Sequence, residues 1–132
     1  MSDEAVPIET PTRFARYTVA DGAGIAIGTM LKLTDPNTAV AHSGDGDAFA
    51  GIAWEEKTAS DGITEITAAL NGVWDLTDGG ATFDAGELVA LDGTANEVRL
   101  AVEADIITGS VVGKSLEDAG ANEVVRVRVG EW

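Results

Sequence analysis

The chain has 132 residues, enough for one hydrophobic core, and its 8 basic and 23 acidic residues give a net charge of −15. A surface of this sign repels phosphates and anionic lipid headgroups, so we expect no nucleic-acid and no membrane partner. The chain has no cysteine, which excludes disulfides, thiolate metal sites and cysteine nucleophiles. With 45% hydrophobic residues, the chain should fold despite its charge.

Residues 1–14 predict an extended N-terminal arm. Pro7 and Pro11 fix their own φ and favour extended geometry in the residue before them. The start of the chain lacks the apolar segment of a secretory signal, and no apolar run is long enough to span a bilayer. The arm either frays as an ordinary terminus or orders on the surface of a partner.

From residue 15 to residue 132, short apolar runs alternate with glycine and Asp-Gly turns, which predicts a single all-β domain. The spacing is typical of a small β-sandwich or barrel. Helical periodicity is weak and allows a turn or two at Ala101–Thr108 or Ser115–Ala121. The expected strands are Arg16–Ala20, Thr29–Leu33, Ala48–Trp54, Ile63–Leu70, Glu87–Leu91, Val98–Val102, Val111–Ser115 and Val124–Val129.

The last of these strands has the clearest pattern. Val125, Val127 and Val129 alternate with Arg126 and Arg128. Successive side chains of a strand point to opposite faces, so one face should be buried and the other cationic. The two arginines either pair with acidic groups of a neighbouring subunit or form a solvated outer face.

Residues 28–74 and 86–132 indicate an internal repeat. Each half has a strand after a glycine, a variable loop, a Gly-initiated segment that ends in two acidic residues, and a final strand that ends in Gly-x-Trp. Convergence of simple β-patterns is the alternative explanation. The matched segments are Thr29–Leu33 with Glu87–Leu91, and Gly51–Glu56 with Gly113–Asp118.

The sequence contains no catalytic constellation. His42 precedes Ser43, but no Gly-x-Ser-x-Gly elbow is present, so the segment from Ser43 to Asp47 is interpreted as a solvated loop. Gly113-Lys114-Ser115 lacks the first glycine of a phosphate-binding loop. We therefore expect no enzymatic activity and no cofactor.

A metal site is not expected either. A calcium loop that began at Asp45 would place Ala50 at the position that requires glycine. A looser cation site at Asp45 and Asp47, or at Asp75 and Asp78, stays open. Such carboxylates also come close together by chance in so acidic a chain.

The few aromatic residues indicate packing more than ligand binding. Trp54 and Trp74 are expected in the core, because a nucleic-acid or glycan platform needs several exposed rings together. Trp132 either caps the core or anchors a contact between subunits.

The order of these motifs resembles the small capsid decoration (cement) proteins of tailed double-stranded DNA viruses. The resemblance covers residues 22–129. It implies a compact, β-tulip-like fold, no enzymatic activity and binding to the outer surface of the shell built by the major capsid protein, commonly as a trimer. The segments that carry it are Gly28–Leu33, Phe49–Ala53, Asn71–Trp74, Ala85–Asp92, Val111–Ala119 and Val125–Val129.

On this hypothesis the arm binds the shell, and its deletion from Met1 to Phe14 should abolish binding and leave the fold intact. Arginines in the arm would steer an otherwise acidic molecule toward acidic shell protein. The expected site is the virion's outer surface, after assembly in the host cytoplasm. Expected shell-binding residues are Val6, Pro7, Ile8, Pro11, Arg13, Phe14 and Arg16, and expected oligomer contacts are Arg126, Arg128 and Trp132.

The dispersed acidity favours adaptation to high salt, as in a haloarchaeal virus, because salt screens self-repulsion. An acidic protein from an ordinary host is the alternative. Two other functions stay open. One is a different virion surface component, either a head fibre base or a host-glycan-binding adhesin domain. The other is a small cation-binding or enzyme-accessory domain.

Overall fold

The structure, a computed structural model, describes residues 4–80 and 82–130. The all-β class is confirmed. The elements are β1 (Val6–Glu9), β2 (Phe14–Thr18), β3 (Met30–Asp35), β4 (Thr38–Ala41), β5 (Phe49–Ala53), β6 (Glu65–Ala69), β7 (Gly72–Asp78), β8 (Leu88–Leu91), β9 (Glu97–Leu100), α1 (Glu103–Thr108), β10 (Val111–Ser115) and β11 (Val124–Val129).

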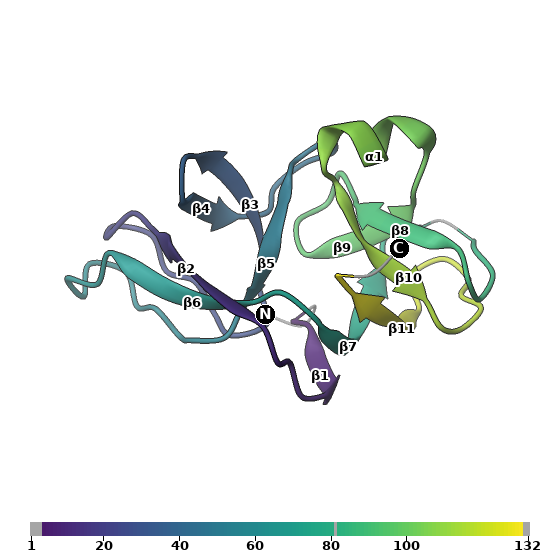
Figure 1. The fold of residues 1–132 in the computed structure, drawn as a ribbon, viewed down its shortest axis with the longest axis horizontal. Coiled ribbons are helices and arrows are strands. Elements are labelled where there is room, and N and C mark those ends of the chain that lie inside the picture. The colour runs from purple at the N-terminus through teal and green to yellow at the C-terminus, as the bar shows by residue number, and fades with distance from the viewer. Residues whose placement is uncertain (1–3, 81, 131–132) are drawn as a thin grey trace.

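The strands form two small barrels side by side, as Figure 1 shows. The first barrel is the closed ring β2-β4-β3-β5-β6. The second is a sheet in the order β1-β7-β11-β10-β8-β9, in which an additional β7–β9 pairing closes every strand except β1 into a ring. The prediction of a sandwich or barrel is therefore confirmed in its barrel form.

The two barrels have the same strand connectivity. In each, the first strand (β2 or β7) pairs antiparallel with the last (β6 or β11) and parallel with the third (β4 or β9). The remaining pairings, β3–β4, β3–β5 and β5–β6, correspond to β8–β9, β8–β10 and β10–β11. The structural repeat covers residues 14–69 and 72–129, so each unit begins earlier than the sequence repeat places it.

The glycines aligned in the two halves hold the same place in the ladders. Leu31 of β3 is opposite Gly51 of β5, and Val89 of β8 is opposite Gly113 of β10. Gly51 has φ +140°, which an L side chain rarely adopts, and a Cβ there would lie 2.8 Å from the carbonyl oxygen of Ala69. The glycines thus allow a close approach of neighbouring strands.

The acidic residues that end the repeated motif have equivalent structural roles. The N–H of Thr67 donates to Glu55 at 2.6 Å, and the N–H of Arg126 donates to Glu117 at 3.0 Å. These carboxylates therefore satisfy backbone donors beside a strand, which is why the acid recurs in both halves. The hydrogen bond from Thr67 is the largest cause of a lowered pKa of the Glu55 carboxyl.

The junction between the barrels combines apolar core residues with buried polar contacts. Met30, Ile52 and Ala69 of the first barrel belong to the core cluster of the second. Buried His42 accepts the N–H of Asn96 at Nδ1 (3.0 Å), and its Nε2 lies 2.7 Å from the carbonyl oxygen of Asp92. This assigns Nε2 as the protonated nitrogen and gives His42 a structural role.

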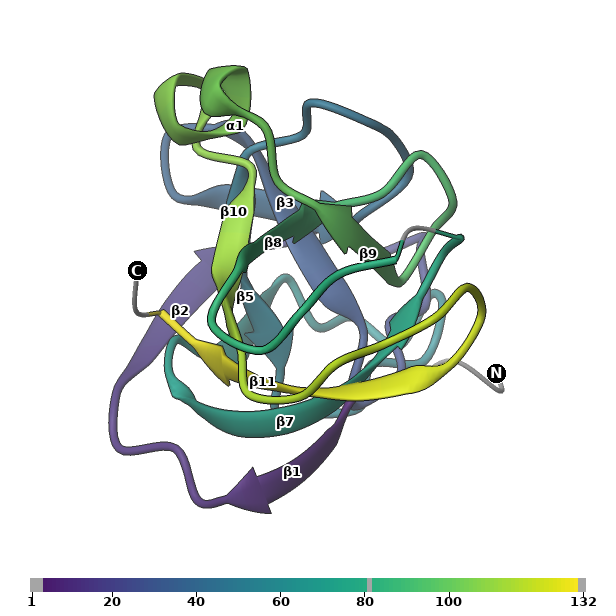
Figure 2. The same cartoon turned by 90° about the vertical axis from the view of Figure 1, so that its right-hand side faces the viewer.

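The N-terminal arm differs from the prediction of a segment separate from the body. Its residues Val6–Glu9 form β1, which pairs antiparallel with β7, as Figure 2 shows along the lower edge of the molecule. Ala5 is buried, and its N–H donates to the carbonyl oxygen of Gly28 at 2.9 Å. The prolines correctly indicate extended backbone, but the ladder partner belongs to the same chain. Phe14 is the first residue of β2, so a deletion through Phe14 would cut the first barrel.

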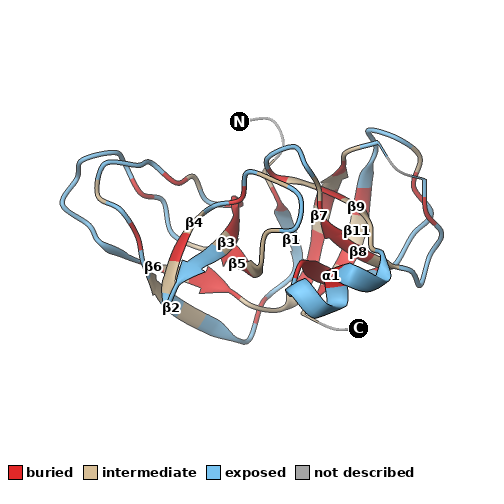
Figure 3. Cartoon of the chain, turned by 90° about the horizontal axis from the view of Figure 1, so that it is seen from above, coloured by how far each residue is buried: buried red, intermediate tan, exposed pale blue. Residues whose placement is uncertain are grey.

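Other strand boundaries also differ. The strands predicted from the sequence do not include β4 or β7. The predicted strand Arg16–Ala20 begins and ends two residues later than β2 does. The helix lies in Ala101–Thr108 and not in Ser115–Ala121, where the chain has a turn and an isolated bridge at Ala119. Figure 3 shows buried residues concentrated on the strands, and α1 largely exposed.

Candidate interaction surface

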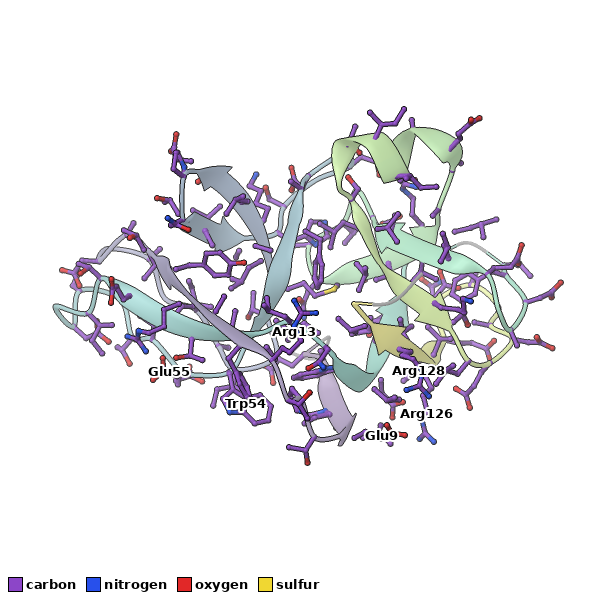
Figure 4. The ribbon with its side chains drawn as sticks, viewed as in Figure 1. Glu9, Arg13, Trp54, Glu55, Arg126 and Arg128 are labelled. Atoms are coloured by element: carbon purple, nitrogen blue, oxygen red, sulfur yellow. The ribbon has the colours of Figure 1, made fainter. Side chains whose placement is uncertain are left out.

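One side of the molecule brings together most residues singled out in the sequence. We call this side the β1 face and define it by Val6, Ile8, Arg13, Phe14, Arg16, Trp54, Arg126 and Arg128. Figure 4 shows Trp54 of the first barrel and Arg126 and Arg128 of the second toward the lower side of the molecule, with Arg13 nearer its centre. Val6, Ile8 and Phe14 are 53%, 43% and 44% exposed, whereas Pro11 is buried. Trp132 lies outside the described residues.

The arginines expected in a subunit contact pair within the chain. Arg126 Nε lies 3.3 Å from Asp75 of the neighbouring strand β7. Arg128 Nη1 lies 3.9 Å from Glu9 and so links β11 to β1 across β7. Both side chains are about 40% exposed, at 42% and 40%, so they remain accessible from solvent.

The arginine on β2 is held in a polar cluster. Arg16 Nη1 donates to Thr67 Oγ1 at 2.8 Å and lies 3.4 Å from Glu55, and Arg16 Nε lies 3.6 Å from Glu65. These side chains are about half exposed, so the pairs contribute little stability. Arg13 is exposed, and its side chain forms no ion pair with any described residue.

A row of aromatic rings leads from the β1 face into the core. The rings of Phe14 and Trp54 are tilted with centroids 5.7 Å apart, and Trp54 meets Trp74 edge to face at 5.9 Å. Trp74 is fully buried and donates its Nε1–H to the carbonyl oxygen of Asn71 at 3.0 Å. The core prediction thus holds for Trp74, while Trp54 is only half-buried. Phe14 is therefore an exposed ring supported by Trp54 and, through it, by the core.

The β1 face differs in charge from the rest of the molecule. Arg13, Arg16, Arg126 and Arg128 are four of the chain's five arginines. In a molecule of net charge −15, these arginines offset part of the negative charge on the β1 face, where Arg16, Arg126 and Arg128 are each paired with a carboxylate.

A second exposed apolar patch lies on α1, at the top of Figure 1 and away from β1. Val102, Ile106 and Ile107 are 58%, 55% and 86% exposed. α1 is inserted between β9 and β10, where the first barrel has a loop between β4 and β5. It is therefore the main departure from the repeat.

Of the carboxylates considered for a cation site, Asp45, Asp47 and Asp75 are already paired with cationic side chains, and Asp78 is buried and accepts the N–H of Gly80 at 3.1 Å. Asp45 lies 2.7 Å from Arg99, and Asp47 lies 3.6 Å from Lys32. Within residues 4–80 and 82–130 there is no pocket and no group of His, Asp and Glu side chains arranged to hold a metal ion. No helix of the described chain is long and apolar enough to cross a membrane.

The most extensive ion pair anchors α1. Arg99 donates to both carboxylate oxygens of Asp105, at 2.7 and 2.8 Å, and Asp105 also accepts the N–H of Val102 at 2.7 Å. The hydrogen bonds from Arg99 are the largest cause of a lowered pKa of the Asp105 carboxyl. A lowered pKa in the folded state stabilises the fold above the unfolded pKa, and that stability is lost as the pH falls through the folded value.

We expect Asp105→Asn to lower the free energy of unfolding near neutral pH by about 2 kcal/mol, because it removes the charged acceptor of two hydrogen bonds from Arg99, which keeps its ion pair with Asp45. The variant should also lose less stability than the wild type between about pH 5 and pH 2. Denaturant unfolding across this range measures both effects. Glu103→Gln, at an exposed site of the same helix, is the control. Equal acid sensitivity of Asp105→Asn and wild type would contradict this role.

The fold defined by these observations is a tandem pair of five-stranded barrels with an added edge strand. It is similar to the crystal structure of the N base of head fibre protein gp8.5 from bacteriophage phi29. The TM-score is 0.55 at 12% identity, over 89% of this chain and 94% of that one. At this identity the likeness shows the fold. No family model and no curated protein sequence matches the chain.

Proposed function

We propose that the chain is a non-enzymatic virion surface protein, a capsid decoration protein that binds the outside of the shell formed by a major capsid protein. The observation that carries the proposal is the fold shared with a phage head fibre base over nearly the whole length of both chains. The motif order that resembles decoration proteins supports it independently. A trimer on the shell is the expected assembly, because multiple contacts convert weak binding into avidity.

The β1 face is the surface that best fits the shell contact. It combines exposed apolar side chains on rigid strands with most of the arginines of an acidic molecule. An apolar centre with a charged rim is the usual anatomy of a protein interface. The contact therefore uses the folded edge formed by β1, β2, β7 and β11, in place of a free arm.

Co-sedimentation with purified shells that lack this protein tests the proposal. Wild-type protein should pellet with the shells, and Phe14→Ala should weaken binding at least about tenfold, since a buried interface aromatic is often worth more than 1.4 kcal/mol. Ile107→Ala, an exposed apolar residue on α1, is the matched control. Loss of binding in Ile107→Ala alone would place the contact at α1, and no pelleting of the wild type would contradict the function.

A head fibre base is the second candidate, because the similar structure is described as the base of a head fibre. The number of bound copies separates the two functions. A decoration protein should saturate shells at every equivalent junction between capsomers, whereas a fibre base should stop at a small subset of sites. Quantitative gel analysis of saturated shells measures this ratio.

The proposal of a salt-adapted virus makes a separate prediction about stability. At a net charge of −15, molar salt shortens the Debye length to about 3 Å and screens self-repulsion. We expect the melting temperature to rise by at least about 5 °C between 20 mM and 2 M KCl, measured by circular dichroism, which corresponds to about 1 kcal/mol. A melting temperature that stays level or falls would contradict salt adaptation.

A further inference from the structure

The internal repeat exposes an unfilled position on the first barrel. In the second barrel, β7 has β11 on one side, while its other side is shared by β9 and β1. In the first barrel, β2 has β6 on one side, and among the strands of residues 4–80 and 82–130 only β4 pairs with its other side. The counterpart of β1 is missing there, and the residues at the unfilled position follow from the ladder registers.

Successive residues of β2 direct their backbone N–H and C=O groups alternately to its two edges. The N–H of Leu70 donates to the carbonyl oxygen of Arg13 at 2.9 Å, so Arg13 and every second residue after it face β6. Phe14, Arg16 and Thr18 therefore present their N–H and C=O groups to the opposite edge. Of these, Thr18 pairs with β4, and no other described strand pairs with Phe14 or Arg16.

The same alternation on β7 identifies the residues equivalent to Phe14, Arg16 and Thr18 of β2. The N–H of Asp78 donates to the carbonyl oxygen of Glu123 at 2.8 Å, so Val73, Asp75 and Thr77 face away from β11. Thr77 pairs with β9 in parallel, as Thr18 does with β4. Val73 and Asp75 pair with β1. Phe14 and Arg16 thus hold the positions that bind a strand in the second barrel.

The free edge of β1 is less suited to accept a strand. Pro7 is opposite Trp74, a residue that faces β11, so Pro7 is turned toward solvent and offers no N–H there. Proline at an outer edge is a common means of blocking further pairing. The β2 edge has no proline, and both Phe14 and Arg16 are exposed.

We infer that the edge of β2 at Phe14–Arg16 binds an extended segment of a partner protein as an additional antiparallel strand, in the manner of β1 on β7. Main-chain hydrogen bonds would supply the affinity of such strand addition, and the side chains directly opposite would supply its specificity. The inference rests on the proposed function only for the source of the segment, which would be the shell protein.

Charge and packing define the segment. The guanidinium of Arg16 leans toward β6, where its half-exposed pairs with Glu55 and Glu65 contribute little stability, so a partner carboxylate opposite Arg16 competes for it. A partner residue opposite Phe14, which packs on Trp54, gains from being apolar. Because the partner strand runs antiparallel to β2, its chain meets Arg16 before Phe14. The expected partner sequence is therefore a carboxylate followed two residues later by an apolar side chain. The chain's own β1 has the reverse order, since Val6 is opposite Asp75 and Glu9 is opposite Val73. A second copy's β1 would therefore place its acid on Phe14, so the occupant is a different protein.

The test uses two blocked peptides, TTETITT and its reverse TTITETT, and amide exchange measured by NMR on the full chain. We expect TTETITT to slow exchange of the Phe14 and Arg16 amides, while those of Ala15 and Tyr17 are already protected in the free protein. TTITETT should bind at least about tenfold more weakly. No protection by TTETITT, or equal effects of both peptides, would overturn the inference.

Two variants at Arg16 separate the contribution of its backbone N–H to peptide binding from the contribution of its side chain. Arg16→Ala removes the guanidinium and keeps the N–H, whereas Arg16→Pro also removes the N–H, which does not serve the ladder with β6. Arg16→Pro should bind TTETITT about tenfold more weakly than Arg16→Ala, with the amides of β6 protected in both variants as evidence of folding. Equal binding by the two variants would also overturn the inference.

The same exchange measurement on shell-bound protein distinguishes this inference from the proposed function. Shell binding with unprotected Phe14 and Arg16 amides would overturn strand addition and leave the decoration role in place. Failure to bind shells would contradict the decoration role, and the peptides alone would then decide whether the edge accepts a strand.

Discussion

Gly113→Ala is expected to be the most destabilising of the single substitutions considered, with a loss of at least about 3 kcal/mol in the free energy of unfolding, at the upper end of the range for overpacking. A Cβ at this position would overlap the carbonyl oxygen of Arg128 on the neighbouring strand β11. Backbone cannot move aside as a flexible side chain can, so β10 and β11 would have to separate. Denaturant unfolding followed by circular dichroism measures the loss.

Gly93→Ala is the matched control, because a Cβ at Gly93 meets nothing within 4 Å. Its free energy of unfolding should change by no more than about 0.5 kcal/mol. If Gly113→Ala and Gly93→Ala unfold at the same denaturant concentration, then the close approach of β10 and β11 described above does not exist in solution.

Removal of residues 1–9 is expected to have the second largest effect, a loss of about 2–4 kcal/mol from a few ladder hydrogen bonds at about 1 kcal/mol each. The truncation deletes β1, uncovers Val73 and Asp75 on β7, and removes Ala5 from its contact with Gly28. An uncovered sheet edge is a template for pairing with another chain. We therefore expect the truncated protein to self-associate, as measured by light scattering after size-exclusion chromatography.

Glu9→Gln is the control for this truncation, since it removes the ion pair with Arg128 and keeps the strand. That pair is exposed at 3.9 Å and should contribute less than about 1 kcal/mol. A truncated chain that keeps the oligomeric state and the stability of the full chain would show that β1 is a passive extension. Residues 1–9 would then be an arm that the fold does not need, as the sequence predicts.

Local patterns in the sequence were sufficient for the fold class and for part of the repeat. The alternation in Val124–Val129 predicts which side chains are buried because a strand has a period of two, and Val125, Val127 and Val129 are fully buried. The alignment of Gly51 with Gly113 anticipates equivalent ladder positions because a close strand approach requires the same residue in both barrels.

Features that depend on tertiary context could not be predicted in the same way. β7 begins with a glycine and contains Asp75 and Asp78, residues that disfavour strands in isolation. Pro7 and Pro11 predict extended backbone but contain no information on which strand lies beside it. The unpaired edge at Phe14 and Arg16 emerges only from comparing the registers of two barrels, which no local pattern encodes.

The most direct test of the proposed function is electron cryomicroscopy of shells purified without this protein and then saturated with it. We predict added density on the outer surface at the junctions between capsomers, into which the two barrels fit with β1, β2, β7 and β11 toward the shell. Shells that show no added density at saturating protein would contradict the assignment as a decoration protein.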